Sequence, residues 1–214
     1  TYPEFLIRPR RYASDKILAK KLIAGQEHLW STNKMQESKI PEATLYALKY
    51  GTVIFKTIWD PDKWDGMGDV VYSVVHPMNF YHDPRAYEIE DMDYCFTAVP
   101  KSLEYFARRW PDKGHLVTPD QDWAESEGLE GRDAAKEEQP ATLKEYWFRD
   151  KEGNVCVMYY AGNVVLDVIG GEYTDGEPIY RHNKFPFAKF VDYPGDKEFW
   201  GFGEIEVAET LQRL

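Results

Sequence analysis

The sequence predicts an α+β fold in which N-terminal helices pack on antiparallel β-hairpins and a β-meander, with a helix at the C-terminal end. Two stretches with apolar residues at helical spacing open the chain, and short β-branched and aromatic runs separated by turns follow them. Strands and helices do not alternate as a doubly wound fold requires. Of the 214 residues, 43% are hydrophobic and 15% aromatic, which is enough for a core and argues against a disordered chain.

The helices are predicted from apolar spacing and from residues that begin or end helices. The first runs over about residues 14–30, and one face of it should rest on a core; that face is formed by Leu18, Leu22, Gly25 and Leu29. A second helix should begin at Pro41 and end at Gly51. A third follows Gly203, with apolar residues at a three-residue step: Ile205, Ala208, Leu211 and Leu214. Because no helix-ending residue follows and the first residue is not Met, we expect a fragment of a longer chain.

Strands are predicted where β-branched and aromatic residues cluster between turns. They span residues 52–59, 70–76, 94–99, 143–149, 155–160 and 164–169, and residues 184–190 form a further extended segment. Residues 76–84 should form a bent strand ending in a turn, because each proline restricts the residue before it. Ser102 should cap a short helix that Pro111 ends.

An acidic tract divides the predicted elements. Residues 120–139 contain eight acidic and two basic side chains and few large apolar ones, which predicts a flexible, solvated loop and the most mobile internal segment. We therefore predict one domain in three parts: residues 1–119 with the helices and hairpin, the loop 120–139, and residues 140–214 with the meander and the start of the last helix.

Charge and composition narrow the classes of function. The formal net charge is −11, which argues against a protein that holds nucleic acid mainly by neutralising phosphates. No apolar run is long enough for a membrane span, and the first residues do not resemble a signal peptide. Cys95 and Cys156 stand far apart without a CxxC spacing, as is typical of a reducing compartment.

A loop with four aspartates is the first candidate for a metal site. Asp60, Asp62, Asp65 and Asp69 could suggest a calcium loop. Trp64, however, occupies a ligand position, and the glycine register does not fit an EF-hand. A polar hairpin loop is the better interpretation.

Two other groups of residues could suggest chemistry. His76, His82 and Asp83 could form a metal site or an acid/base pair, but their spacing fits no metal motif and a structural role is favoured. The glycines of residues 201–203 resemble half of a phosphate loop, but the third glycine and the Lys-Ser/Thr pair are missing. A tight turn that lets the helix pack closely is the better interpretation. We predict no catalytic, cofactor-binding or metal-ligating residue, and no cofactor.

The seven tryptophans could stack on carbohydrate or on single-stranded nucleic acid. Most fall at positions that should face a core, and the acidic composition disfavours nucleic acid. Three lie in loop contexts and are predicted interface residues: Trp64, Trp123 and Trp200.

The order of four segments resembles the N-terminal, wing-forming region of the portal proteins of tailed double-stranded DNA bacteriophages. The first is a helix followed by a strand and an acidic turn (50–60), and the second is the segment 74–86 with Pro77, Phe80 and Asp83-Pro84-Arg85-Ala86. The third is a strand with a Ser-capped helix (91–111). The fourth joins Lys184-Phe185-Pro186-Phe187 to the glycines of 200–204 and to Leu211-Gln212.

This resemblance implies a structural protein rather than an enzyme. It implies one wing domain whose last helix leads toward a stem outside the chain, in a ring of about twelve subunits. The implied partners are copies of the chain itself, a terminase packaging motor, the capsid, tail adaptor proteins and double-stranded DNA that passes without sequence specificity; no membrane is implied. The implied location is the capsid vertex of the virion, with the host cytoplasm during assembly or from a prophage.

Two alternatives remain open from the residues alone. One is a non-viral module that binds carbohydrate or protein, which exposed coplanar tryptophans would support. The other, less favoured, is a hydrolase that uses Asp83 and His82.

Overall fold

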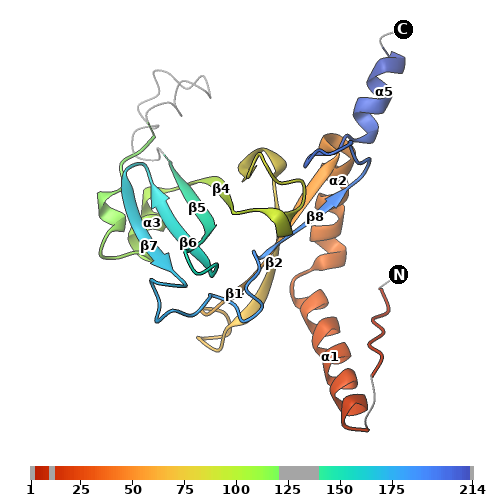
Figure 1. Ribbon diagram of the computed structural model, residues 1–214, viewed down its shortest axis with the longest axis horizontal. Coiled ribbons are helices and arrows are strands. Elements are labelled where there is room, and N and C mark those ends of the chain that lie inside the picture. The colour runs from red at the N-terminus through yellow and green to blue at the C-terminus, as the bar shows by residue number, and fades with distance from the viewer. Residues whose placement is uncertain (1–2, 10–12, 121–139, 213–214) are drawn as a thin grey trace. The chain divides into compact units, whose positions relative to one another are not determined.

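The structure, a computed structural model, describes residues 3–9, 13–120 and 140–212 and confirms the α+β class (Figure 1). Helices accompany two antiparallel sheets, one of three strands and one of five. The chain divides into two compact units, which we call unit 1 (Thr1–Pro77 with Pro186–Leu214) and unit 2 (Met78–Phe185). The predicted loop over 120–139, including Trp123, lies outside the described residues except for Asp120.

Unit 1 combines the helices from the two ends of the chain with the smaller sheet. Its elements are α1 (Ala13–Thr32), a π-helix (Met35–Lys39), α2 (Ile40–Tyr50), β1 (Thr52–Asp60), β2 (Asp69–Val75), β8 (Phe187–Val191) and α5 (Glu204–Gln212). The strand order is β2-β1-β8, with antiparallel pairing throughout. Strand β8 pairs with β1 only over Thr52–Lys56, so the rest of β1 extends with β2 as a two-stranded hairpin.

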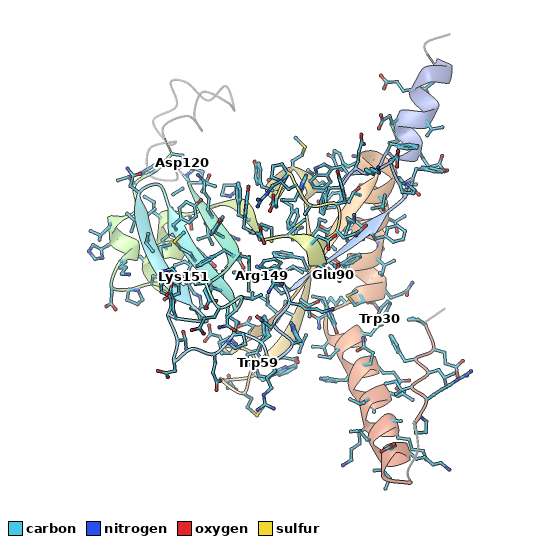
Figure 2. All side chains as sticks on the ribbon, in the orientation of Figure 1. Trp30, Trp59, Glu90, Asp120, Arg149 and Lys151 are labelled. Carbon is cyan, nitrogen blue, oxygen red and sulfur yellow. The ribbon has the colours of Figure 1, made fainter. Side chains whose placement is uncertain are left out.

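Asn33 ties the end of α1 to the edge strand β2. Its side-chain amide donates to the Leu29 and Val70 carbonyls at 3.0 Å, and its Oδ1 accepts from the Tyr72 backbone N–H at 2.9 Å. These bonds satisfy backbone groups that an edge strand otherwise leaves open. A second contact is made by Trp30, which is labelled in Figure 2. Its ring meets that of Phe5 edge to face, with the ring centroids 5.6 Å apart.

The junction of α2 and β1 depends on Gly51. Its φ of +71° ends the helix in the left-handed region, and a side chain there would collide with the backbone of Gly201 and Phe202. Buried Thr52 accepts a hydrogen bond from the Gly201 N–H at 2.8 Å. The α2–β1 junction and the segment before α5, about 150 residues apart in the sequence, therefore meet at this turn.

Unit 2 is built on a five-stranded meander. Its elements are β3 (Phe80–His82), β4 (Tyr94–Lys101), α3 (Leu103–Arg109), β5 (Ala141–Arg149), β6 (Val155–Ala161) and β7 (Val164–Ile169), with the strands in the order β3-β4-β5-β6-β7. Phe106 of α3 is fully buried against one face of the sheet, among the core residues Val117, Ala141, Leu143, Ala161 and Leu166. The predicted cap is confirmed, because Ser102 Oγ accepts from the Tyr105 N–H at 3.3 Å.

Three local features differ from what the sequence predicts. The bent strand over 76–84 is instead a 3-10 helix (Pro77–Asn79) followed by the short strand β3, since the fixed φ of proline suits a helical turn. The π-helix before α2 was not predicted. The third error is the buried face of α1: Leu18 and Leu22 are 56% and 50% exposed, whereas Ala19 is buried.

The contacts at the end of α1 explain this third error. The side of α1 that faces inward runs through Ala19, Ile23, Gln26, Trp30 and Asn33. Neighbouring helical residues differ by about 100° in direction, so this side lies about a quarter turn from the predicted one. The bonds of Asn33 to β2 and the contact of Trp30 with Phe5 fix the rotation of the helix.

Candidate functional site

The loop with the four aspartates uses its carboxylates to hold a turn. Asp69 accepts hydrogen bonds from the Trp64 indole N–H and from the Val70 N–H, both at 2.8 Å, and Asp60 accepts from the Asp62 N–H at 3.1 Å. The indole bond lowers the pKa of the Asp69 carboxyl. Within the described ranges, no three His, Cys, Asp or Glu side chains are grouped so that they could hold a metal ion.

The segment with Asp83 contains a closed ion pair. The Asp83 side chain is 2% exposed and accepts from Arg85 through the backbone N–H (3.0 Å), Nε (3.1 Å) and Nη2 (2.9 Å). Arg85 Nη2 also donates to Asp93 at 3.0 Å. The side-chain and backbone hydrogen bonds of Arg85 lower the pKa of Asp83 to about 2.

This geometry suits a structural turn better than proton transfer. His82 Nδ1 lies 2.8 Å from the backbone oxygen of Asp83, not from its carboxylate. The carboxylate is ionised and saturated by Arg85 near neutral pH, whereas a general base needs a pKa near the working pH. Ala86, which is buried, donates its N–H to the Asp83 carbonyl at 3.0 Å and completes the turn.

The glycines before α5 serve close packing. A side chain on Gly203 would collide with the Leu48 carbonyl at the end of α2, and one on Gly201 would collide with Val191. Glu204 accepts a hydrogen bond from the Tyr193 hydroxyl at 2.7 Å. The segment therefore joins α5 to α2 and β8, in agreement with the tight turn that the sequence favours.

The structure places two of the three predicted interface tryptophans in separate segments of unit 1. Trp64 lies in the β1–β2 loop and is 54% exposed, while Trp200 precedes α5, is half-buried and meets Phe199 edge to face at 4.9 Å. Trp59, which was predicted to face a core, is instead 52% exposed on the hairpin (Figure 2). It lies where β8 no longer pairs with β1, and its indole covers Gly68.

Helices of unit 1 expose further apolar side chains that sequence reasoning did not identify as surface. They are Ile17, Leu18 and Leu22 on α1, Leu45 and Leu48 on α2, and Ile205 and Val207 on α5. Helical spacing identifies such rows but cannot show whether the same chain covers them. Where such side chains form a contiguous row on one helix, they are typical of surfaces that bind another protein, whereas single exposed apolar residues are common on any protein.

Unit 2 carries a row of aromatic rings on the sheet face opposite Phe106. Tyr81, Phe96 and Tyr146 are cross-strand neighbours on β3, β4 and β5, and Phe148 follows on β5. The ring centroids of successive members lie 4.5, 6.4 and 5.5 Å apart. Alternate aromatic residues in strands 94–99 and 143–149 were the available signal for this row.

No described helix combines the length and the apolar character that crossing a membrane requires. A search for similar curated proteins finds no match. The sequence profile of one family, described as phage P22-like portal protein, matches residues 1–186 and so covers the first three segments of the resemblance completely. Since the match extends over most of the 214 residues, the chain belongs to the phage P22-like portal protein family.

Proposed function

We propose that this chain is part of a subunit of a phage portal ring, through which double-stranded DNA is packaged and ejected and which joins head to tail. The family match over residues 1–186 carries the proposal, because portal proteins are structural head–tail connectors of the virion. Two features support a structural role. Asp83 is held by Arg85 instead of being available for proton transfer, and unit 1 exposes apolar helical surfaces.

The net charge fits a passage for DNA. Each chain carries a formal charge of −11, and a surface of the same sign as the phosphates does not hold the duplex in place. DNA without sequence specificity is therefore the proposed cargo of the ring.

The remaining partners are inferred from the family. We propose a ring of about twelve copies that contacts the terminase motor, the capsid and tail adaptor proteins. Its proposed location is the capsid vertex, with the host cytoplasm during assembly. Both units together form the proposed wing region, with the three-part division at 119 and 140 retained as a prediction, and Trp64, Trp123 and Trp200 remain the proposed interface residues.

Electron microscopy of a full-length portal protein that contains this chain tests the proposal. We expect closed rings with a central hole. A full-length protein that stays monomeric at micromolar concentration, or that turns over a small substrate, would contradict it.

A further inference from the structure

Helix α1 carries an apolar row that the described part of the chain leaves largely uncovered. Leu18, Leu22, Gly25 and Leu29 follow the 4-3-4 spacing of a coiled-coil seam, and we call them the α1 seam. Leu18 and Leu22 are 56% and 50% exposed, while the inward side of the helix runs through Ala19 and Trp30. The seam is thus available to a second helix.

Gly25 is a second, independent sign of a partner. A glycine inside a helix lowers the stability of the helix relative to alanine. Among the residues that the structure describes, none lies within 4 Å of a Cβ built at Gly25, so no contact within this part of the chain accounts for the glycine. A glycine on an exposed seam does allow another backbone to approach closely.

Charge identifies the partner as acidic. Residues 1–34 contain seven basic and three acidic side chains, whereas residues 35–214 contain 19 basic and 34 acidic ones. The net charges are therefore +4 and −15. In the heptad pattern Lys21 flanks the seam, while Lys20 points to the opposite side. A second copy of this chain supplies an acidic surface of the kind that this flank favours.

Helix α5 is the matching surface on the second copy. It contains Glu204, Glu206 and Glu209 and has no basic residue over Glu204–Gln212. Ile205 is 55% exposed and lies on the same helical side as exposed Ala208, between Glu204 and Glu209. The helix thus presents an apolar row with a carboxylate on each flank.

We propose that the α1 seam of one copy packs on the Ile205–Ala208 side of α5 of the next copy, with Lys21 beside Glu209. Two different surfaces meet in this contact, so it is heterologous and repeats around a ring. The inference rests on the proposed function, since it names surfaces through which neighbouring ring subunits bind.

Disulfide trapping between separately tagged chains tests the pairing. A chain that carries Leu22→Cys is mixed under mild oxidation with a differently tagged chain that carries Ile205→Cys. The native Cys95 and Cys156 are fully buried, so the wild type should give a low background of cross-linking. We expect a mixed dimer in several-fold excess over either homodimer. Ala24→Cys, exposed on the far side of α1, is the matched control and should give little mixed dimer.

A charge reversal then tests the polar flank. Lys21→Glu should reduce the mixed dimer several-fold, whereas Lys20→Glu, with the same change in net charge, should leave it nearly unchanged. Glu209→Lys on the partner should restore trapping by the Lys21→Glu chain. Equal effects of the two lysine variants would overturn the assigned orientation of the seam.

The remaining outcomes separate this inference from the proposed function. If Leu22→Cys traps mainly with itself, the seam is a symmetric contact and the heterologous pairing is wrong. If a full-length protein forms rings but its Leu22→Cys and Ile205→Cys variants do not cross-link, the pairing is wrong and the ring stands. If no rings form, the proposed function fails.

Discussion

At the scale of single residues, the clearest stabilising interaction is the Asp83–Arg85 ion pair. A buried carboxylate requires partners, and here one arginine supplies three hydrogen bonds within a two-residue step. Arg85 also donates to Asp93, the residue immediately before β4, so it links the turn after β3 to the next strand. The pair explains why Asp and Arg flank Pro84 without any need for catalysis.

We expect Arg85→Gln to lower the free energy of unfolding, because Asp83 loses its charged donors while the backbone bond remains. The effect stays moderate because the Arg85 side chain is 73% exposed and screened by water. Urea unfolding measures the change. Arg85→Lys, which keeps the charge without the two-pronged geometry, should have a stability between those of the wild type and Arg85→Gln. An unchanged free energy of unfolding for Arg85→Gln would contradict the assignment.

The Asp83–Arg85 pair also predicts how the stability of the protein depends on pH. The folded pKa of Asp83, about 2, lies below its ordinary value of 3.8, so ionised Asp83 stabilises the folded state above about pH 4. That stabilisation is lost as the pH falls from about 4 towards 2. We expect the stability difference between wild type and Asp83→Asn to be constant from pH 7 to 5 and to shrink below pH 4, as urea unfolding can show. A difference that is unchanged at pH 3 would be evidence against the pair.

At the scale of elements, alanine substitutions of two glycines, one inside α1 and one at the end of α2, should change the stability in opposite directions. Gly51→Ala should destabilise unit 1 by more than about 1 kcal/mol, because φ is +71° and a methyl group would collide with the 201–202 backbone. Gly25→Ala should stabilise by about 0.5–1 kcal/mol, since the position is helical and open. Thermal or urea unfolding of both variants gives the comparison. Stability changes of the same sign in the two variants would show that one of the two environments is misassigned.

The cap of α3 gives a second prediction for an element. Ser102→Ala removes the side-chain acceptor at 3.3 Å and leaves the Tyr105 N–H with its 3.0 Å bond to the Ser102 carbonyl, so it should cost about 0.5–1 kcal/mol of stability. Ser102→Asp keeps an acceptor at the same place and should stay close to wild type. Hydrogen exchange of the first turn of α3 should report the loss locally; unchanged protection in Ser102→Ala would contradict the role of the cap.

At the scale of the whole molecule, the exposed α1 seam favours association between copies of the chain, whereas their net charge opposes it. Helix α1 is about 30 Å long, and contact along one face of it buries less than the roughly 1,000 Å² typical of a stable interface. Copies that each carry −11 also repel one another. We therefore expect native mass spectrometry of the 214-residue chain at micromolar concentration to show mainly monomers. A full-length portal protein measured in parallel should show rings, and a stable oligomer of the 214-residue chain would contradict this balance.

The sequence by itself determined the elements and the family. Helix ends at Gly51 and Ser102, strands from β-branched and aromatic runs, and the order of segments around Asp83-Pro84 all depend on residues close together in the chain. The α+β class and the portal resemblance follow from such local signals; the helices and two antiparallel sheets confirm the first, and the family match confirms the second. The preference for a structural role of Asp83 also came from the sequence, although its partner Arg85 did not.

Only the tertiary structure decided which faces are covered. The rotation of α1 depends on Asn33 binding Val70 and Tyr72, almost forty residues later, so periodicity alone selected the wrong face. The exposure of Trp59 depends on β8, which joins β1 from far along the chain and stops pairing at Lys56. A helix or strand with two apolar sides can bury either one, and contacts between distant segments determine which side remains for a partner.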